Sequence, residues 1–119
     1  MQKNNNLQNK SLIFWIHISK YYLALKNKRY FEVASQLFRS GTSIGANIKE
    51  AQGAESVKDF LHKLQISLKE AYETLYRLDI LSQWFEEDTK ILTYKCEELV
   101  KILVSITKSL KQKLWTTHY

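Results

Sequence analysis

The absence of proline is the sequence feature that most restricts the possible folds. The 119 residues include no proline and only three glycines, Gly41, Gly45 and Gly53. Folds rich in strands or loops use these two residue types at their turns, so a chain nearly without them favours long, uninterrupted helices. The hydrophobic content of 45% supports a buried core, and the length is that of one domain. The sequence therefore predicts a single all-α domain.

Apolar side chains recur at spacings of three and four residues in four segments, which is the pattern of amphipathic helices. The first predicted helix begins at Ser11 and ends near Asn27, and its expected core side chains are Leu12, Trp15, Ile16, Tyr22 and Leu23. The second follows the short polar connection 27–29, and its expected core side chains are Val33, Leu37, Ile44, Ile48 and Ala51. Gly53 is expected to follow this helix as its C′ residue.

Two further signals place the starts of the other helices. Ser56 and Asp59 match a capping box, in which the serine oxygen accepts a hydrogen bond from the amide three residues on. The core side chains expected of this third helix are Phe60, Leu64, Leu68, Ala71, Leu75, Leu78 and Leu81. The acids at 86–88 precede the fourth helix and complement the positive end of its dipole. The core side chains expected there are Leu92, Leu99, Ile102, Leu103, Ile106 and Leu110.

Short connections make consecutive helices run antiparallel, so the predicted fold is an up-down-up-down antiparallel four-helix bundle. We expect the bundle domain to cover residues 11–115, preceded by a frayed segment at 1–10 and followed by a C-terminal tail at 116–119. In such a bundle the first and fourth helices lie side by side.

The net charge of +6 is unevenly distributed along the chain. Residues 1–30 carry six basic side chains and no acid, and residues 90–119 carry six basic and two acidic side chains. Adjacent first and fourth helices are expected to form one positive flank, which suits salt-sensitive phosphate contacts that read little sequence. The candidate nucleic-acid-binding residues are Lys20, Lys26, Lys28, Arg29, Lys101, Lys108, Lys111 and Lys113. The alternative is a solvated, lysine-rich surface with no such role.

Aromatic side chains accompany these lysines in the sequence. Tyr21, Tyr22 and Tyr30 lie beside the first basic group, and Trp115 follows the second. Aromatic rings beside basic residues can stack on unpaired bases. The same rings can instead complete the hydrophobic core, which is their commoner use.

The second predicted helix contains two glycines one turn apart, Gly41 and Gly45. Each costs a helix interior about 1 kcal/mol relative to alanine, so the pair indicates close approach of another backbone or subunit. Polar side chains share one side of this helix, and the candidate packing or assembly residues are Arg39, Gly41, Ser43, Gly45, Asn47 and Glu50. Their expected partners on the third helix are Lys63, Glu70 and Glu73. The pattern leaves open whether this row faces the chain's own bundle or a neighbouring subunit.

The sequence predicts no catalytic, metal or cofactor site. The histidines His17, His62 and His118 fall on different segments without ligand spacing, and the single cysteine, Cys96, excludes an internal disulfide. There is no nucleophile–base arrangement and no phosphate-binding glycine loop. No apolar run reaches the length that spans a bilayer. We therefore expect a cytoplasmic protein that is not an enzyme and has no membrane partner.

One stretch resembles a known family. Residues 36–51 read QLFRSGTSIGANIKEA, and they are followed by Ser56, Lys58-Asp59-Phe60, Lys63-Leu64, Glu70-Ala71 and Glu73-Thr74. Together these residues closely resemble the four-helix bundle proteins encoded in intervening sequences of bacterial 23S ribosomal RNA genes. The resemblance covers most of the chain.

The resemblance implies a bacterial cytoplasmic protein that assembles into a ring-shaped homo-oligomer, commonly a pentamer, with a basic surface for RNA. Related bundles are accessory proteins of the reverse transcriptases of diversity-generating retroelements, which implies an RNA-processing or reverse-transcribing protein as a partner. No catalytic residue is implied. The alternative function is a protein–protein interaction scaffold without a nucleic-acid role, in which basic and acidic surfaces pair between subunits.

Overall fold

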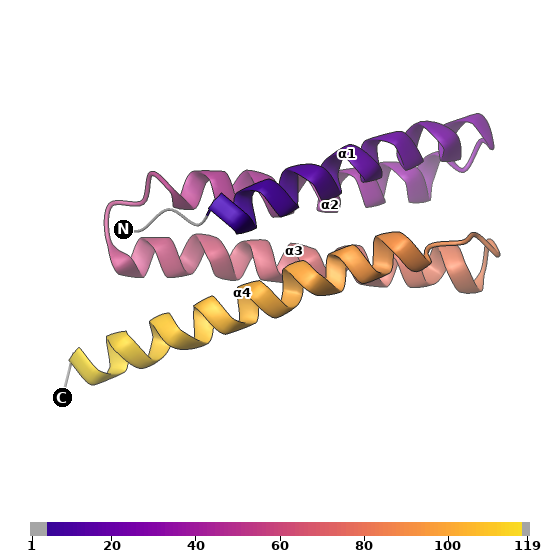
Figure 1. The fold of residues 1–119 in the computed structure, drawn as a ribbon. Helices are drawn as coiled ribbons and strands as arrows, with labels where there is room; N and C mark the ends of the chain where they lie inside the picture. The colour runs from indigo at the N-terminus through magenta and orange to yellow at the C-terminus, as the bar shows by residue number, and fades with distance from the viewer. Residues whose placement is uncertain (1–4, 118–119) are drawn as a thin grey trace.

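A computed structural model describes residues 5–117 of the chain as four helices, with no strand in this range. Helix α1 spans Asn5–Asn27, α2 spans Phe31–Ala51, α3 spans Val57–Gln83 and α4 spans Lys90–Thr117 (Figure 1). The all-α fold and the number of helices expected from the sequence are confirmed. None of these four helices combines the length and the apolar composition needed to cross a membrane.

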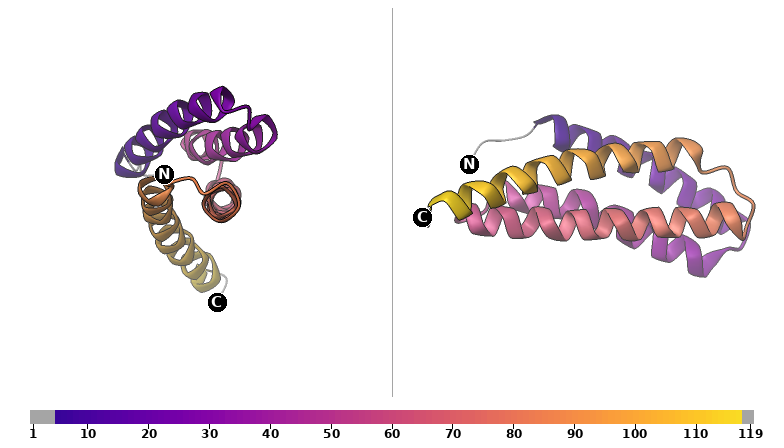
Figure 2. Two further views of the ribbon diagram at one scale, coloured as in Figure 1. Left: turned by 90° about the vertical axis from the view of Figure 1, so that its right-hand side faces the viewer. Right: turned by 90° about the horizontal axis from the view of Figure 1, so that it is seen from below.

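The helices occupy the four corners of an antiparallel arrangement, which is clearest in the end-on view (Figure 2, left). Each helix packs on its neighbours in sequence, and α1 also touches α4. Among the described residues, the backbones of α1 and α3 do not approach each other closely, nor do those of α2 and α4, so each of these pairs lies across a diagonal. The α1–α4 contact is the smallest of the four, because α4 diverges from the other helices toward its C-terminus (Figure 1).

Three local features explain where the helices begin and end. The Ser56 hydroxyl oxygen accepts a hydrogen bond from the Asp59 amide at 3.0 Å, which confirms the predicted cap. After α1, the Tyr30 amide donates to the Leu25 carbonyl at 3.0 Å, and Arg29 takes a left-handed φ of 67°. This is a Schellman ending in which arginine stands where glycine is usual. Gly53 follows α2 in the expected position but without a left-handed φ.

Helix α1 differs from the prediction at its start. It begins at Asn5 rather than Ser11, so the expected frayed segment is wrong for residues 5–10. Leu7 explains the difference: it is fully buried and continues the apolar stripe of Phe14 by one more heptad. Residues 1–4 and 118–119, which include His118, lie outside the described part of the chain.

The buried face of α1 is also not the predicted one. The core side chains are Leu7, Ser11, Phe14, Ile18 and Leu25. Of the five side chains expected in the core, Leu12, Ile16 and Leu23 are exposed. Trp15 is partly buried, and Tyr22 is partly buried and packs against the core. Both sides of this helix carry apolar side chains at helical spacing, so periodicity alone selects the wrong side.

In the other three helices the expected stripes are correct. Every predicted core residue of α2 is buried, and those of α3 and α4 are buried or packed against the core. The core of α4 gains one residue that sequence reasoning did not place there, Cys96. Its thiol lies against the Ala71 carbonyl at 3.4 Å, and burial raises the pKa of this thiol to about 12.

The two glycines of α2 have different surroundings. A Cβ at Gly41 would lie 3.1 Å from Cγ2 of Ile18, a fully buried side chain of α1. A Cβ at Gly45 would lie 3.5 Å from the Ser11 hydroxyl oxygen, which is an ordinary contact. The close approach of α1 therefore leaves little room for a Cβ at position 41 and ordinary room for one at position 45.

This difference predicts opposite effects of alanine at the two positions. Gly45→Ala should raise the free energy of unfolding by up to about 1 kcal/mol, because alanine is the better helix former. Gly41→Ala should lower it by about 1 kcal/mol, because overpacking against Ile18 outweighs the same propensity gain. Chemical denaturation of the two variants beside the parent protein measures both effects. Equal changes of one sign would contradict the assignment of Gly41 to the α1–α2 contact.

Candidate nucleic-acid and assembly surfaces

The basic candidates form two groups at opposite ends of the bundle. Lys20, Lys26, Lys28 and Arg29 lie in the last turns of α1 or just after it. Lys101 lies near the middle of α4, and Lys108, Lys111 and Lys113 lie in its last turns. Because α1 and α4 run antiparallel, their C-terminal ends point in opposite directions (Figure 1). The single positive flank expected from the sequence is therefore wrong.

The group at the end of α1 is partly neutralised. Lys28 forms an ion pair with Glu87, which follows α3, and the Tyr21 hydroxyl donates to the same carboxylate at 2.9 Å. The ammonium group of Lys28 lowers the pKa of Glu87. Burial, together with Glu87, raises the pKa of Tyr21. Glu87, one of the acids 86–88 that were expected to serve the dipole of α4, thus also faces the basic end of α1.

The group on α4 is more open. Lys101, Lys108 and Lys111 are exposed on one face of the helix, spaced by seven and three residues. We call these three residues the α4 lysine stripe. Within residues 5–117 none of the three forms an ion pair. The stripe covers about 15 Å of helix, and Trp115 continues it with 68% of its surface exposed.

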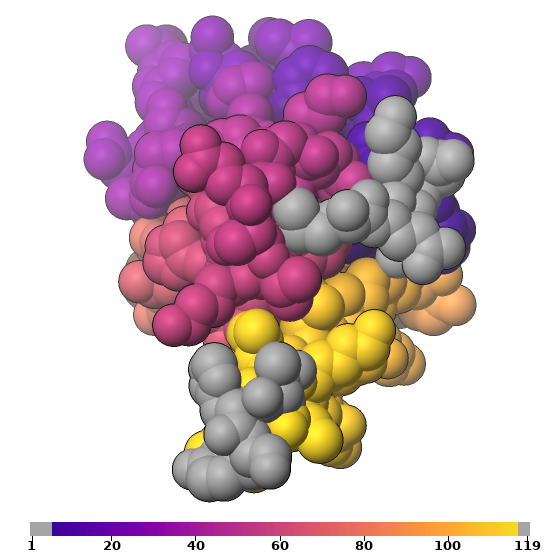
Figure 3. Space-filling view, turned by 90° about the vertical axis from the view of Figure 1, so that its left-hand side faces the viewer, coloured from indigo at the N-terminus to yellow at the C-terminus, as the bar shows by residue number. Residues whose placement is uncertain are grey.

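The stripe leads to one end of the molecule. In the space-filling view of that end, the last residues of α4 lie beside the segment that connects α2 to α3 (Figure 3). Lys113 is also exposed there, but two residues beyond Lys111 it lies on a different side of the helix.

The three candidate tyrosines are engaged within the chain. Tyr22 stacks on Phe38 with ring centroids 4.5 Å apart, and Tyr30 packs on Phe85 at 4.7 Å. The Tyr21 hydroxyl is bound to Glu87. These three rings therefore match the alternative in which they complete the core and do not stack on bases. Trp115 is the one candidate aromatic whose ring is largely exposed.

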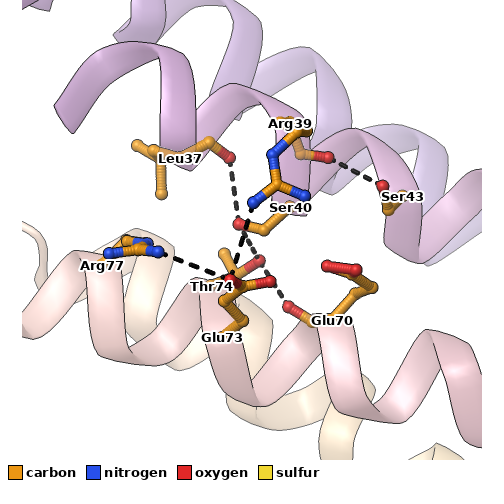
Figure 4. A network of polar contacts seen from close by, with 8 residues as sticks. All are labelled: Leu37, Arg39, Ser40, Ser43, Glu70, Glu73, Thr74 and Arg77. Carbon is orange, nitrogen blue, oxygen red and sulfur yellow. Dashed lines mark hydrogen bonds and ion pairs between the residues drawn. The ribbon is translucent and has the colours of Figure 1, made fainter. Parts of the chain in front are cut away.

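The polar row on α2 lies along its seam with α3. Arg39 pairs with Glu73 at 3.6 Å, and Glu50 pairs with Lys63 at 3.1 Å (Figure 4 shows the first pair). Ser43 and Asn47 donate to carbonyls one turn back in α2 itself. Two of the three partners expected on α3, Lys63 and Glu73, are thus confirmed. The row is an intramolecular seam on the surface of the bundle and not a part of its core.

A second polar layer lies beneath this seam, and sequence reasoning missed it. The Thr74 hydroxyl donates to the Ser40 hydroxyl at 2.8 Å, and the Ser67 hydroxyl donates to the Ile44 carbonyl at 2.8 Å. All three hydroxyl-bearing side chains are fully buried (Figure 4 shows two of them). The signal was present, because Ser67 and Thr74 interrupt the apolar stripe of α3 at core positions seven residues apart.

Two carboxyl groups meet at the seam. Partial burial, followed by the neighbouring Glu73, raises the pKa of Glu70. Interaction with the Glu70 carboxyl, assisted by Arg39 and Arg77, lowers the pKa of Glu73. Glu70 points toward α2, and its Oε1 atom is buried without a hydrogen-bond partner (Figure 4). Of the two carboxyls, Glu70 is therefore the one that takes up a proton first as the pH falls.

An apolar groove crosses the α1–α2 seam above Gly45. It has a volume of about 490 Å³, and its walls include Leu12, Trp15 and Ile48. The Trp15 indole donates to the Thr42 hydroxyl at 2.9 Å, which holds the ring at the rim. Lys49 is the only charged side chain among the described residues that line it. Within residues 5–117 no three histidine, cysteine or acidic side chains cluster as metal ligands would.

Opposite pKa shifts predict opposite pH effects of two matched variants. A raised pKa in the folded state means that Glu70 stabilises the fold below its unfolded pKa of about 4.3 and that this contribution is lost as pH rises. Glu70→Gln should therefore melt at a higher temperature than the parent near pH 7, and this gap in melting temperature should close near pH 4. Glu73, with its lowered pKa, contributes stability above its unfolded pKa. Glu73→Gln should melt below the parent near pH 7, and this gap should also close on acidification.

Thermal melting followed by circular dichroism across this pH range measures both gaps. Equal destabilisation of Glu70→Gln and Glu73→Gln at neutral pH would contradict the opposite pKa shifts of the two carboxyls.

The comparisons with known proteins agree with this geometry. The family described as 23S rRNA-intervening sequence protein matches residues 3–105. A crystal structure of a protein of unknown function from the S23 ribosomal protein family of Bacteroides thetaiotaomicron superposes with a TM-score of 0.83 and 42% sequence identity. The match covers 86% of this chain and 98% of that one. No curated protein matches. The chain belongs to the family of 23S rRNA-intervening sequence proteins.

Proposed function

We propose that this chain is a non-enzymatic bacterial cytoplasmic protein that binds RNA through the α4 lysine stripe. The observation that carries the proposal is the α4 lysine stripe: three exposed lysines on one helix face, none of them paired within residues 5–117. Ammonium groups in a row bind a phosphate backbone without reading its sequence. The exposed Trp115 ring beside the stripe offers a stacking surface for an unpaired base.

The proposal includes assembly into a ring-shaped homo-oligomer, and a pentamer is the form that the family resemblance favours. A stripe of three lysines supplies modest affinity by itself. Several copies that engage one polyanion raise the overall affinity without any new contact, because later contacts become intramolecular. An RNA-processing or reverse-transcribing protein is the partner class proposed for such an accessory protein.

The arrangement of polar groups supports a role outside catalysis. The charged residues of the α2–α3 seam are engaged with one another, and the α1–α2 groove combines one lysine with largely apolar walls. Neither site joins a nucleophile to a base.

The second candidate function is a protein–protein interaction scaffold without RNA. It is favoured by the intramolecular ion pairs of Lys10, Lys28 and Lys63, which engage basic side chains that RNA would otherwise contact. It is also favoured by the exposed apolar side chains of α1. The two functions differ in one measurable property, the affinity for RNA at low salt.

The lysine stripe predicts both the affinity for RNA and its salt dependence. Replacing Lys101, Lys108 and Lys111 with alanine should weaken binding of a short labelled single-stranded RNA at low salt. For single strands the slope of log K against log salt is about −0.7 per phosphate contact, so the slope should flatten by about 2. Fluorescence anisotropy titrations at several salt concentrations measure both quantities.

The matched control replaces Lys26, Arg29 and Lys90, which are exposed at the other end of the bundle, and so removes the same charge. This control should retain most of the affinity. An equal loss of RNA affinity in both triple variants would show that only net charge matters. If the parent protein does not bind RNA at low salt, the scaffold is the function that is supported.

A further inference from the structure

Helix α1 presents an apolar face to solvent. Leu12, Ile16 and Leu23 lie on the side of the helix opposite the buried Phe14 and Ile18, and Leu12 and Leu23 are 58% and 60% exposed. Lys20 continues the same face between Ile16 and Leu23. We call these four residues, Leu12, Ile16, Lys20 and Leu23, the α1 outer face.

A helix that is apolar on both sides is normally covered on both sides. Phe14 and Ile18 are covered by the chain's own bundle, but nothing within residues 5–117 covers the α1 outer face. Large exposed apolar patches on soluble proteins mark interaction sites. The charge of this face is one-sided, because α1 contains lysines and no acid.

A complementary face lies on α3. Tyr72 and Tyr76 are exposed on the outer side of this helix, with 61% of Tyr76 accessible. Lys69 and Asp79 complete the same row, at spacings of three, four and three residues, and both are exposed. We call these four residues, Lys69, Tyr72, Tyr76 and Asp79, the α3 outer face. It is about 15 Å long, close to the length of the α1 outer face.

The two outer faces are on opposite sides of the molecule, because α1 and α3 lie across a diagonal (Figure 2, left). We propose that the α1 outer face of one copy packs on the α3 outer face of a second copy. This inference rests on the proposed homo-oligomer and specifies its contact. Two different patches on opposite sides make a heterologous interface, which generates a ring when the rotation closes.

The charges select this pairing and its register. Cyclic symmetry keeps all copies pointing the same way along the ring axis, so the C-terminal half of α1 meets the C-terminal half of a neighbour's α3. Lys20 then lies near Asp79, and Lys69 falls opposite the uncharged half of the α1 outer face. An α1–α1 contact would bring lysines together without an acid, which like-charge repulsion disfavours.

The test uses two variants, each with one damaged face. Leu12→Glu with Leu23→Glu damages the α1 outer face, and Tyr72→Glu with Tyr76→Glu damages the α3 outer face. All four side chains are at least half exposed, so each variant should keep the helical circular dichroism of the parent. Light scattering should give each variant alone the monomer mass of 14.1 kDa. Mixed together, they should form a species of twice that mass, because each supplies the intact face that the other lacks.

The outcomes separate this contact from the proposed function. A monomeric parent protein would overturn the oligomer of the proposed function itself. An oligomeric parent whose damaged variants remain oligomeric would overturn only the faces named above. The Tyr72→Glu, Tyr76→Glu variant keeps an intact α1 outer face. If it forms dimers by itself, α1 pairs with α1, and the proposal is overturned.

A charge exchange tests the register. Lys20→Glu alone and Asp79→Lys alone should each shift the oligomer toward smaller species at a fixed protein concentration, and the double variant should recover the parent mass. The control is Trp84→Glu. Trp84 lies at the tip of the bundle, outside both outer faces, and is 80% exposed. The control should leave the mass of the oligomer unchanged. Failure of the Lys20→Glu, Asp79→Lys double variant to recover the parent mass would contradict the pairing of Lys20 with Asp79.

Discussion

The packing of α2 between two neighbours at a single turn is the constraint on which the rest of the structure depends. On one side Gly41 admits Ile18 of α1, and on the other Ser40 accepts a hydrogen bond from Thr74 of α3. The first contact sets the rotation of α1 about its own axis, because Ile18 must point inward. The second sets the register of α3, because two buried hydroxyl groups must meet. Leu23 on α1 and Tyr76 on α3 face solvent as a consequence of these two contacts.

The sequence predicted the helices better than it predicted the buried side of each one. For α2, α3 and α4 the longest regular apolar stripe is the buried one, so the three- and four-residue spacing identified the core. For α1 the spacing identified the outer side, since Leu12, Ile16 and Leu23 repeat as regularly as Phe14, Ile18 and Leu25. Distinguishing the two stripes of α1 requires knowing which of them packs against Gly41 of α2. This contact joins two helices, so the pattern within one helix does not reveal it.

The candidate residues show the same division between local and long-range information. The polar row of α2 and its pairing with Lys63 and Glu73 followed from helical spacing, which is local. The separation of the basic residues into two groups did not, because it depends on the direction in which α4 returns along α1. The pairing of Lys28 with Glu87 also joins distant parts of the chain. Composition and spacing thus locate charge along the sequence, and only the fold decides which charges neutralise each other.

The division of surfaces among the helices connects the proposed assembly to the proposed RNA binding. The α1 and α3 outer faces occupy two opposite sides of the bundle, and the α4 lysine stripe lies on neither of them. A ring built from the two outer faces therefore leaves every stripe accessible. Because cyclic symmetry points all copies the same way, the stripes of the proposed ring would gather at one end, beside the α2–α3 connections. A polyanion that lies across that end meets several stripes at once, so assembly turns a weak and unselective patch into an extended binding surface.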